Sequence, residues 1–261
     1  RIPDYSIIDT SISIIPVGSD EGVLELPVPW IIRSPRGFTY PDGQIRIPSI
    51  VNTGPNEGDL LIVGEDELAE FPDNAREISG IILDLQSLPP MNDAEIEAIL
   101  VSLSSHLSSS SLILLRDGAD RIEGLFRLVV DLDLDGAIVS LATPGGGRAA
   151  AALPRIGLAS RAMGLDTQGR IIGIELEKQP SAEDLIIVRA SGCSFVVGPI
   201  DEGNEISDIS ETIIPEIVGI MKEAGLSNFH NVGRRILRAK DMETAAISGL
   251  RLIGFERPLP M

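Results

Sequence analysis

The chain has 261 residues, 43% of them hydrophobic, which is enough to fill the core of one α/β barrel or of two smaller domains. Asp and Glu number 39 against 21 Lys and Arg, so the formal net charge is −18. A field of that sign repels phosphate backbones, which excludes nucleic acid as an expected partner and leaves a basic partner subunit or a homo-oligomer open.

The sequence has no typical membrane span or signal peptide, and it has too few cysteines for a disulfide or an iron–sulfur cluster. No apolar run reaches the roughly 18 residues that a membrane span needs, and the first residues lack the basic-then-apolar order of a signal peptide. We therefore expect a cytoplasmic protein without membrane contact. The single cysteine, Cys193, cannot form an internal disulfide or hold an iron–sulfur cluster, and we expect it to be a buried apolar side chain.

Residues 1–55 are typical of an extended lead-in with short strands. Ser11–Val17 and Val23–Leu26 are strand-like, and a further apolar strand, Trp30–Ile32, runs into the polar turn that begins at Arg33. Frequent prolines interrupt this part of the chain. We place the barrel domain over residues 56–261, so that the chain forms a single domain overall.

From residue 56 onward, apolar strands alternate with amphipathic helices. The predicted strands are Leu60–Val63, Ile78–Leu85, Leu112–Leu115, Gly136–Leu141, Arg170–Leu176 and Phe195–Gly198. The predicted helices are Glu65–Phe71, Met91–Leu107 with Asn92 as N-cap, Ile122–Val130, Ile209–Lys222 with Gly225 as C-cap, and Val232–Arg238. This alternation predicts a (β/α)8 barrel with a helical C-terminal tail, and the short segment after its first strand leaves open whether the barrel is complete.

A glycine-rich loop follows the strand Gly136–Leu141. Gly145, Gly146 and Gly147 allow the backbone to approach a ligand closely, and Arg148 adds a guanidinium that can bind an anion. The alternative is a tight turn that binds nothing. Three other arginines could neutralise an anionic ligand or form surface ion pairs: Arg33, Arg36 and Arg116.

The end of the strand Arg170–Leu176 carries the candidate catalytic residues. Glu175 and Glu177 alternate along the chain, so both are expected on one side of the strand at the barrel mouth, as an acid/base pair or as solvated rim residues. Lys178 beside them is a candidate catalytic or solvated lysine. His106 and His230 have no Cys or carboxylate at ligand spacing, so no metal site is expected.

Several segments resemble the FMN-binding barrel domain of glutamate synthase. The matching segments are DTSI…LELPVPWII, DGAIVSLATPGGGRAA, GRIIGIELEKQPSAEDLIIVRASGCSFVVGP and METAAISGLRLIGFE. Asp241–Glu256 follow the family's domain-ending pattern D-x-E-T-A-A-x-T-G-x-x-L-x-G-Y-E nearly residue for residue. The resemblance extends from Ile8 to Glu256 and is thin between Arg33 and Ser79. It implies a (β/α)8 barrel with FMN as cofactor.

Two flavin loops of that family can be compared with this chain. Gly145 and Gly146 match the family's Gly-Gly-Thr-Gly turn, whereas Gly147 and Arg148 replace its last two residues. The family's phosphate loop, S-G-G-[IL]-[RK]-T-[GA]-x-D, corresponds to the segment from Glu175 to Asp184, where both glycines are lost. Carboxylates there would repel a phosphate by about 1 kcal/mol per close pair. The family's cluster cysteines have no counterparts, so no iron–sulfur cluster is expected.

The sequence leaves two main functions open. One is a divergent glutamate synthase-like protein in flavin-dependent redox chemistry, with FMN held by Gly145–Gly147 and by Arg148 or Lys178. The other is a non-catalytic barrel that has lost FMN and serves as a structural or regulatory subunit or as an anion-binding module. A barrel enzyme with new chemistry on Glu175 and Glu177 is a third, less favoured class.

Overall fold

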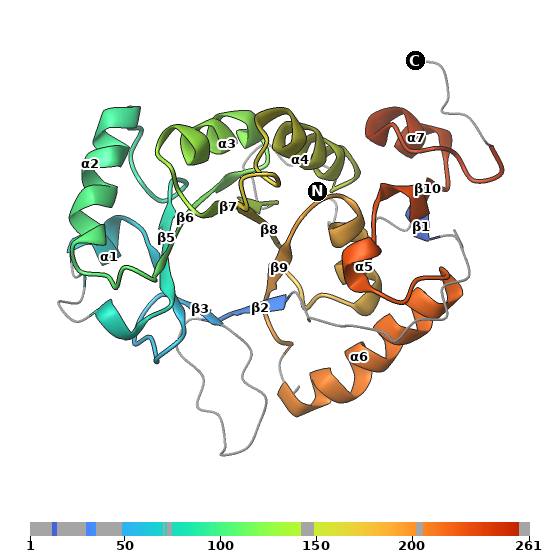
Figure 1. Ribbon diagram of the computed structural model, residues 1–261, viewed down its shortest axis with the longest axis horizontal. Helices are drawn as coiled ribbons and strands as arrows, with labels where there is room; N and C mark the ends of the chain where they lie inside the picture. Colours follow the sequence, from blue (N-terminus) through green and yellow to red (C-terminus); the bar gives the residue numbers. More distant parts are fainter. Residues whose placement is uncertain are drawn as a thin grey trace.

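Eight parallel strands close into a barrel in the computed structural model, each pairing with its neighbours in chain order and the last pairing with the first (Figure 1). The structure describes residues 12–14, 30–34, 49–69, 71, 75–141, 149–201 and 206–255. The barrel strands are β2 (Trp30–Arg33), β3 (Ser49–Val51), β4 (Leu60–Val63), β5 (Gly80–Asp84), β6 (Leu112–Gly118), β7 (Gly136–Ser140), β8 (Ile171–Glu175) and β9 (Phe195–Gly198). This confirms the predicted (β/α)8 barrel fold and shows that its ring of eight strands is closed, although no helix lies in the described segment between β3 and β4.

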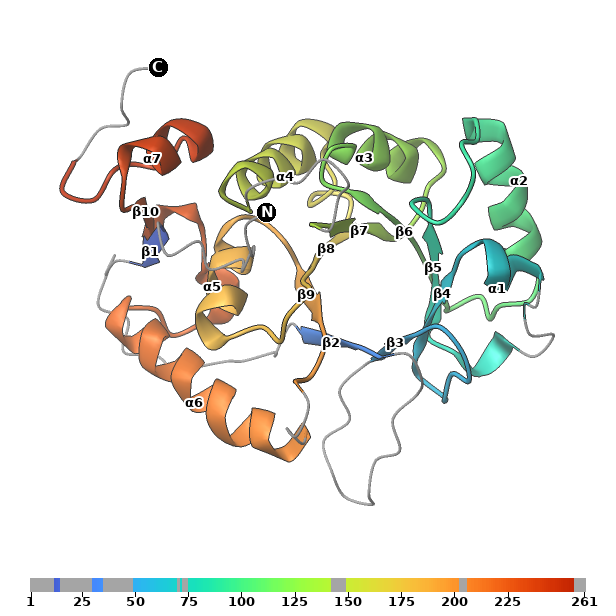
Figure 2. The ribbon, with the colours of Figure 1, turned by 180° about the vertical axis from the view of Figure 1, so that it is seen from behind.

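Helices surround the strands, as seen from both sides in Figures 1 and 2. From β4 onward each barrel strand is followed by a helix: α1 (Glu65–Ala69), α2 (Asp93–Ser104), α3 (Ile122–Asp131), α4 (Ala149–Met163), α5 (Ala182–Ala190) and α6 (Ile206–Glu223). A last helix, α7 (Met242–Ser248), contacts α4. Short 3₁₀ turns complete the described elements: Ala75–Glu77, Phe229–Asn231 and Arg234–Ile236. No helix in the described ranges has the length and apolar character that crossing a membrane requires.

Local signals set the ends of several helices as the sequence predicts. Asn92 caps α2, because its Oδ1 accepts the backbone N–H of Glu95 at 3.1 Å while the Glu95 carboxylate accepts the N–H of Asn92 at 2.8 Å. Gly225 follows α6 with φ +70° and donates its N–H to the Lys222 carbonyl at 3.0 Å. Both predicted caps are confirmed.

The structure corrects the prediction in three places. Val232–Arg238, predicted as a helix, contains a 3₁₀ turn followed by the strand β10 (Leu237–Ala239). This strand pairs antiparallel with β1 (Ile12–Ile14) outside the barrel, and that pairing overrides the local helical pattern. The short strand β3 has no counterpart in the prediction. The barrel also begins before residue 56, because β2 and β3 lie in the segment assigned to the lead-in. The predicted strand Val23–Leu26 lies outside the described residues.

Side-chain alternation along the strands separates two apolar layers. Residues that point inward fill the barrel: Ile50, Leu60, Ile62, Ile82, Leu114, Ile138, Phe195 and Val197. The intervening residues pack against the helices in a larger outer layer that includes Ile32, Leu83, Leu115 and Val139. At the seam, the Trp30 indole donates a hydrogen bond to the Gly198 carbonyl at 3.2 Å, which links the first strand to the last.

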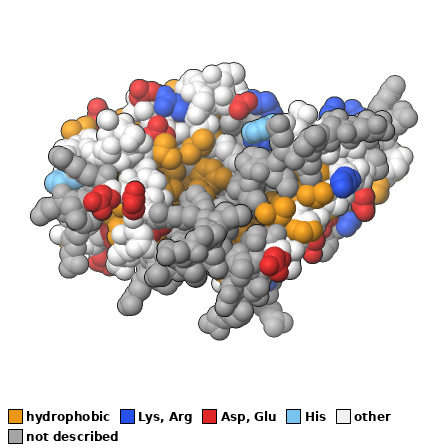
Figure 3. Space-filling model, turned by 60° about the horizontal axis from the view of Figure 1, so that its bottom comes forward, with side chains coloured by type: hydrophobic (Ala, Val, Ile, Leu, Met, Phe, Trp, Pro, Cys, Tyr) orange, Lys and Arg blue, Asp and Glu red, His pale blue; other side chains and the backbone are white. Residues whose placement is uncertain are grey.

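Charged side chains of both signs lie on one face of the molecule (Figure 3). On the face shown in Figure 3, Lys and Arg are scattered among Asp and Glu rather than gathered into one basic stripe. This distribution agrees with the net charge of −18 in disfavouring a phosphate backbone as partner.

The interior layer depends on a glycine in β8. A Cβ atom at Gly173 would overlap the ring of Phe195, which fills the barrel at this level. We expect Gly173→Ala to lower the free energy of unfolding by about 1–3 kcal/mol, because the ring cannot shift in a packed barrel without disturbing its neighbours. Urea unfolding followed by circular dichroism measures this change.

Gly219→Ala is the matched control, because Gly219 lies in α6 and a Cβ there meets no heavy atom within 4 Å. Its free energy of unfolding should stay unchanged or rise by about 0.5–1 kcal/mol, since alanine has the higher helix propensity. Equal losses in the two variants would contradict the packing argument.

Candidate functional site

Five barrel strands carry a polar residue at their carboxyl ends, where sites of this fold are built. Four of these residues lie two positions after an inward-pointing apolar residue, and the fifth, Glu175, lies four positions after inward-pointing Ile171. The period of two therefore directs all five into the barrel. They form what we call the mouth cluster: Arg33, Asp84, Arg116, Ser140 and Glu175.

Arg116 on β6 is the centre of the mouth cluster. Its Nε donates to Glu175 Oε2 at 2.6 Å, its Nη1 to Asp84 Oδ1 at 2.7 Å and its Nη2 to Ser140 Oγ at 3.2 Å. The side chains of the three charged residues are only 12–15% exposed. One guanidinium thus joins β5, β6, β7 and β8 through directed hydrogen bonds in a partly water-excluded layer.

Arg33 approaches the same cluster from β2. Its Nε lies 3.4 Å from Glu175 Oε1, and its Nη1 donates a long hydrogen bond of 3.5 Å to the Ile50 carbonyl. Glu175 therefore lies between two guanidinium groups, with one carboxylate oxygen toward each. Arg33 extends the connection around the barrel to its first strand.

The two arginines differ in electrostatic environment. Burial lowers the pKa of Arg33, and the positive charge of Arg116 adds to this effect while Glu175 opposes it. Burial would also lower the pKa of Arg116, but the charges and hydrogen bonds of Glu175 and Asp84 outweigh it and raise the pKa. Two cations and two carboxylates balance, so the cluster is neutral as a whole.

The structure separates the three predicted catalytic residues. Glu175 points into the barrel mouth, whereas Glu177 and Lys178 are exposed on the loop after β8. Arg33 and Arg116, considered from sequence as anion binders or surface pairs, form ion pairs inside the mouth. The predicted cofactor residues Gly145, Gly146, Gly147 and Arg148 lie outside the described residues, as does Arg36.

Sequence reasoning missed Asp84 and Ser140. Each is the last residue of a strand of otherwise apolar residues or glycine and alanine, GIILD and GAIVS. A polar residue placed two positions after an inward-pointing residue at a strand's carboxyl end is a signal that could have identified both.

The loop that corresponds to the family's phosphate loop is closed by its own residues. At the start of α5, the N–H of Ser181 donates to Asp184 Oδ2 at 2.9 Å, and the N–H of Asp184 donates to Ser181 Oγ at 3.1 Å. Glu183 adds a second carboxylate to this first turn. A Cβ atom on Gly198 would lie 2.9 Å from Pro180 Cδ, so the loop packs directly on the end of β9.

These described residues do not fit a flavin phosphate. A phosphate needs free backbone N–H groups and a positive local field, whereas two N–H groups here are bound to side chains and the charges around them are negative. Among the residues that the structure describes, there is also no group of three or more His, Cys, Asp or Glu side chains that could hold a metal ion.

Comparison with known proteins supports the fold and goes no further. No family model matches the sequence, and no curated protein matches it either. Among solved structures, a mandelate oxidase variant with a monooxide FMN adduct is 13% identical, covers 88% of each chain and has a TM-score of 0.59. Inosine 5′-monophosphate dehydrogenase from Legionella pneumophila is 11% identical, covers 92% of this chain and 99% of its own, and has a TM-score of 0.60. Both likenesses concern the barrel fold.

Removal of the central cation tests the mouth cluster. Arg116→Met leaves Asp84 and Glu175 without their main partner, and we expect the free energy of unfolding to fall by roughly 2–4 kcal/mol. Arg127→Met is the control, because Arg127 pairs with Asp93 where both side chains are more than half exposed, and its loss should stay below about 1 kcal/mol. Similar losses in both variants in urea unfolding would show that the cluster is not a stabilising unit.

Cys193 is excluded as a nucleophile by its environment. The residue is fully buried, and burial raises the pKa of its thiol to about 12 against a smaller opposing effect of Arg189. Because the pKa is raised, the thiol stays protonated at mildly alkaline pH. We expect a thiol reagent to label the native protein only as fast as it unfolds and to label it fully in urea; rapid labelling of the native state would refute this.

Proposed function

We propose that this chain is a divergent barrel of the glutamate synthase FMN type that does not hold FMN at the loop after β8 and acts as a non-catalytic structural or regulatory subunit. The observation that carries this proposal is the start of α5, where Ser181 and Asp184 cap each other and Glu183 adds a further negative charge. A dianionic phosphate placed there would meet two carboxylates and would find the N–H groups of Ser181 and Asp184 already bound.

The mouth cluster supports the same proposal. A general base must offer a lone pair to the substrate, but both oxygens of Glu175 face guanidinium groups of Arg116 and Arg33. The resulting network links five strand ends. Barrel enzymes have their active sites at this end of the barrel, whereas here the same positions form a network that holds the strands together. Glu175, Glu177 and Lys178 remain predictions as catalytic residues, and Gly145–Arg148 remain predictions as cofactor ligands.

Flavin-dependent redox chemistry of the glutamate synthase type is the second candidate. Two observations favour it: the fold is shared with a mandelate oxidase structure that holds an FMN adduct, and the sequence resembles the glutamate synthase domain from Ile8 to Glu256. In that case FMN would supply the redox chemistry, and Arg148 or Lys178 would compensate the charge of its phosphate.

Visible absorption separates the two functions. The protein is purified without added cofactor, and its spectrum is recorded before and after incubation with FMN and gel filtration. We expect a colourless protein that retains no flavin, because the described phosphate loop is closed. Stoichiometric retention of FMN would refute the first proposal, and loss of that retention in Arg148→Ala but not in Arg155→Ala would then assign the flavin to the glycine-rich loop.

A further inference from the structure

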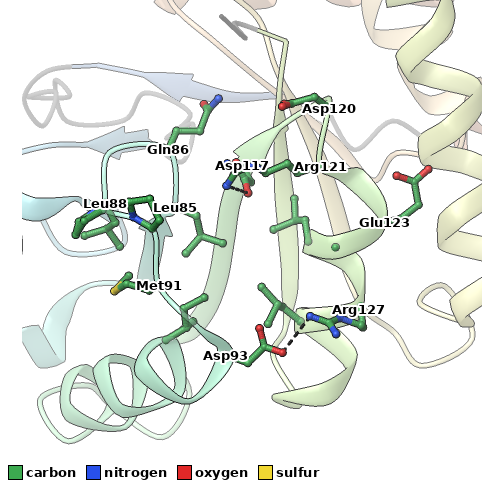
Figure 4. A pocket seen from close by; sticks show the side chains of 16 residues that line it. Leu85, Gln86, Leu88, Met91, Asp93, Asp117, Asp120, Arg121, Glu123 and Arg127 are labelled. Carbon is green, nitrogen blue, oxygen red and sulfur yellow. Dashed lines mark hydrogen bonds and ion pairs between the residues drawn. The ribbon is translucent and has the colours of Figure 1, made fainter. Parts of the chain in front are cut away.

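A concave site lies outside the barrel wall, on the opposite side of β6 from the mouth cluster. Successive residues of a strand point to opposite faces, so Arg116 points into the barrel while Asp117 points toward the helices. Here the loop after β5, the start of α2, the end of β6 and α3 line a pocket of about 480 Å³, which we call the outer pocket (Figure 4). That volume lies in the range of small-molecule sites.

The pocket combines apolar walls with an acidic rim. Figure 4 shows the loop residues Leu85, Leu88 and Met91 on one side and the side chains of α3 on the other. Leu125 and Leu128 on α3 and Ile96 on α2 complete the apolar part. The charged lining residues are four carboxylates, Asp93, Asp117, Asp120 and Glu123, and two guanidinium groups, Arg121 and Arg127. The lining therefore carries a formal net charge of −2.

Asp117 is the one buried charge in this lining. The residue is 5% exposed, and its Oδ1 accepts the N–H of Gly118 at 2.7 Å. Its Oδ2 accepts no hydrogen bond from any described residue and has only the guanidinium of Arg121 at 3.7 Å. Since the Arg121 side chain is 65% exposed, water screens that attraction. Asp117 thus lines the pocket with one carboxylate oxygen whose nearest cation is an exposed guanidinium.

The surroundings of Asp117 disfavour its ionised form, so a nearby cation would stabilise the carboxylate. Burial raises the pKa of its carboxyl group, and the neighbouring charges of Asp120 and Asp84 act in the same direction, against the hydrogen bond from Gly118 and the charge of Arg121. Two other rim carboxylates are already paired, Asp93 with Arg127 at 3.0 Å and Glu123 with Arg155 at 2.7 Å, and the third, Asp120, is exposed to water. A ligand ammonium would therefore gain most at Asp117.

We propose that this pocket binds a small organic amine, with its ammonium group on Asp117 Oδ2 and its apolar body against Leu85, Met91 and Leu125. Both ends of such an amine find a complementary group, because the apolar walls release water on binding and the ammonium pairs with the carboxylate of a largely buried residue. The overall charge of −18 draws cations toward the surface. This assignment is independent of the function proposed for the barrel and of any flavin.

Phenethylamine and 2-phenylethanol are a matched pair of probes, because they share an apolar body and differ in the ammonium group. We expect phenethylamine to bind in isothermal titration calorimetry and the alcohol to bind at least about tenfold more weakly. Asp117→Asn should fold, since its side-chain oxygen can still accept the Gly118 N–H, and should weaken amine binding about tenfold or more. Glu216→Gln, an exposed change on α6 that removes the same charge, should leave binding unchanged.

The position of the amine is read from methionine methyl signals in NMR. Met91 lines the pocket, whereas Met163, Met221 and Met242 do not. With selectively labelled protein we expect phenethylamine to shift the Met91 signal, assigned through Met91→Leu, and to leave those other three in place. Equal affinity of wild type and Asp117→Asn, equal affinity for the amine and the alcohol, or absence of phenethylamine binding would each overturn the proposal. Binding of lysine-containing peptides but not of the free amine would overturn it as well.

Discussion

The alternation of side chains on closed parallel strands is the constraint on which the rest of this structure depends. Once β9 pairs with β2, each barrel residue must point either inward or toward the helices. On β6, Leu114 and Arg116 point inward while Leu115 and Asp117 point outward. A single strand therefore supplies the central cation of the mouth cluster and the buried carboxylate of the outer pocket.

The charges in the mouth cluster have an energetic consequence for the fold. Placing ions in a partly dry layer costs solvation, and well-packed apolar residues would be about as stable or more so. The directed hydrogen bonds from Arg116 to β5, β7 and β8 instead tie strand ends to one another in a fixed register. Asp84 and Glu175 each form an ion pair within the cluster. A charged ligand could bind there only if one of these ion pairs were broken.

The start of α5 is shaped by local capping and packing. Ser181 and Asp184 cap one another at the first turn of this helix. In the segment before them, Glu177 and Lys178 are exposed and Pro180 packs on Gly198. The backbone N–H groups of Ser181 and Asp184 are therefore used by side chains of the same turn.

The sequence by itself determined the βα alternation, most barrel strands, the caps at Asn92 and Gly225 and the burial of Cys193, because these follow from local periodicity and composition. It also placed Glu175 at the mouth. It could not reveal β3, which is three residues long, or β10, which forms only by pairing with a strand more than two hundred residues earlier. The partners of Glu175 come from β2 and β6, and the outer pocket joins α2 to α3. These residues lie far apart in the chain and meet only in the folded barrel, so tertiary structure decided the partners of Glu175 and the lining of the outer pocket.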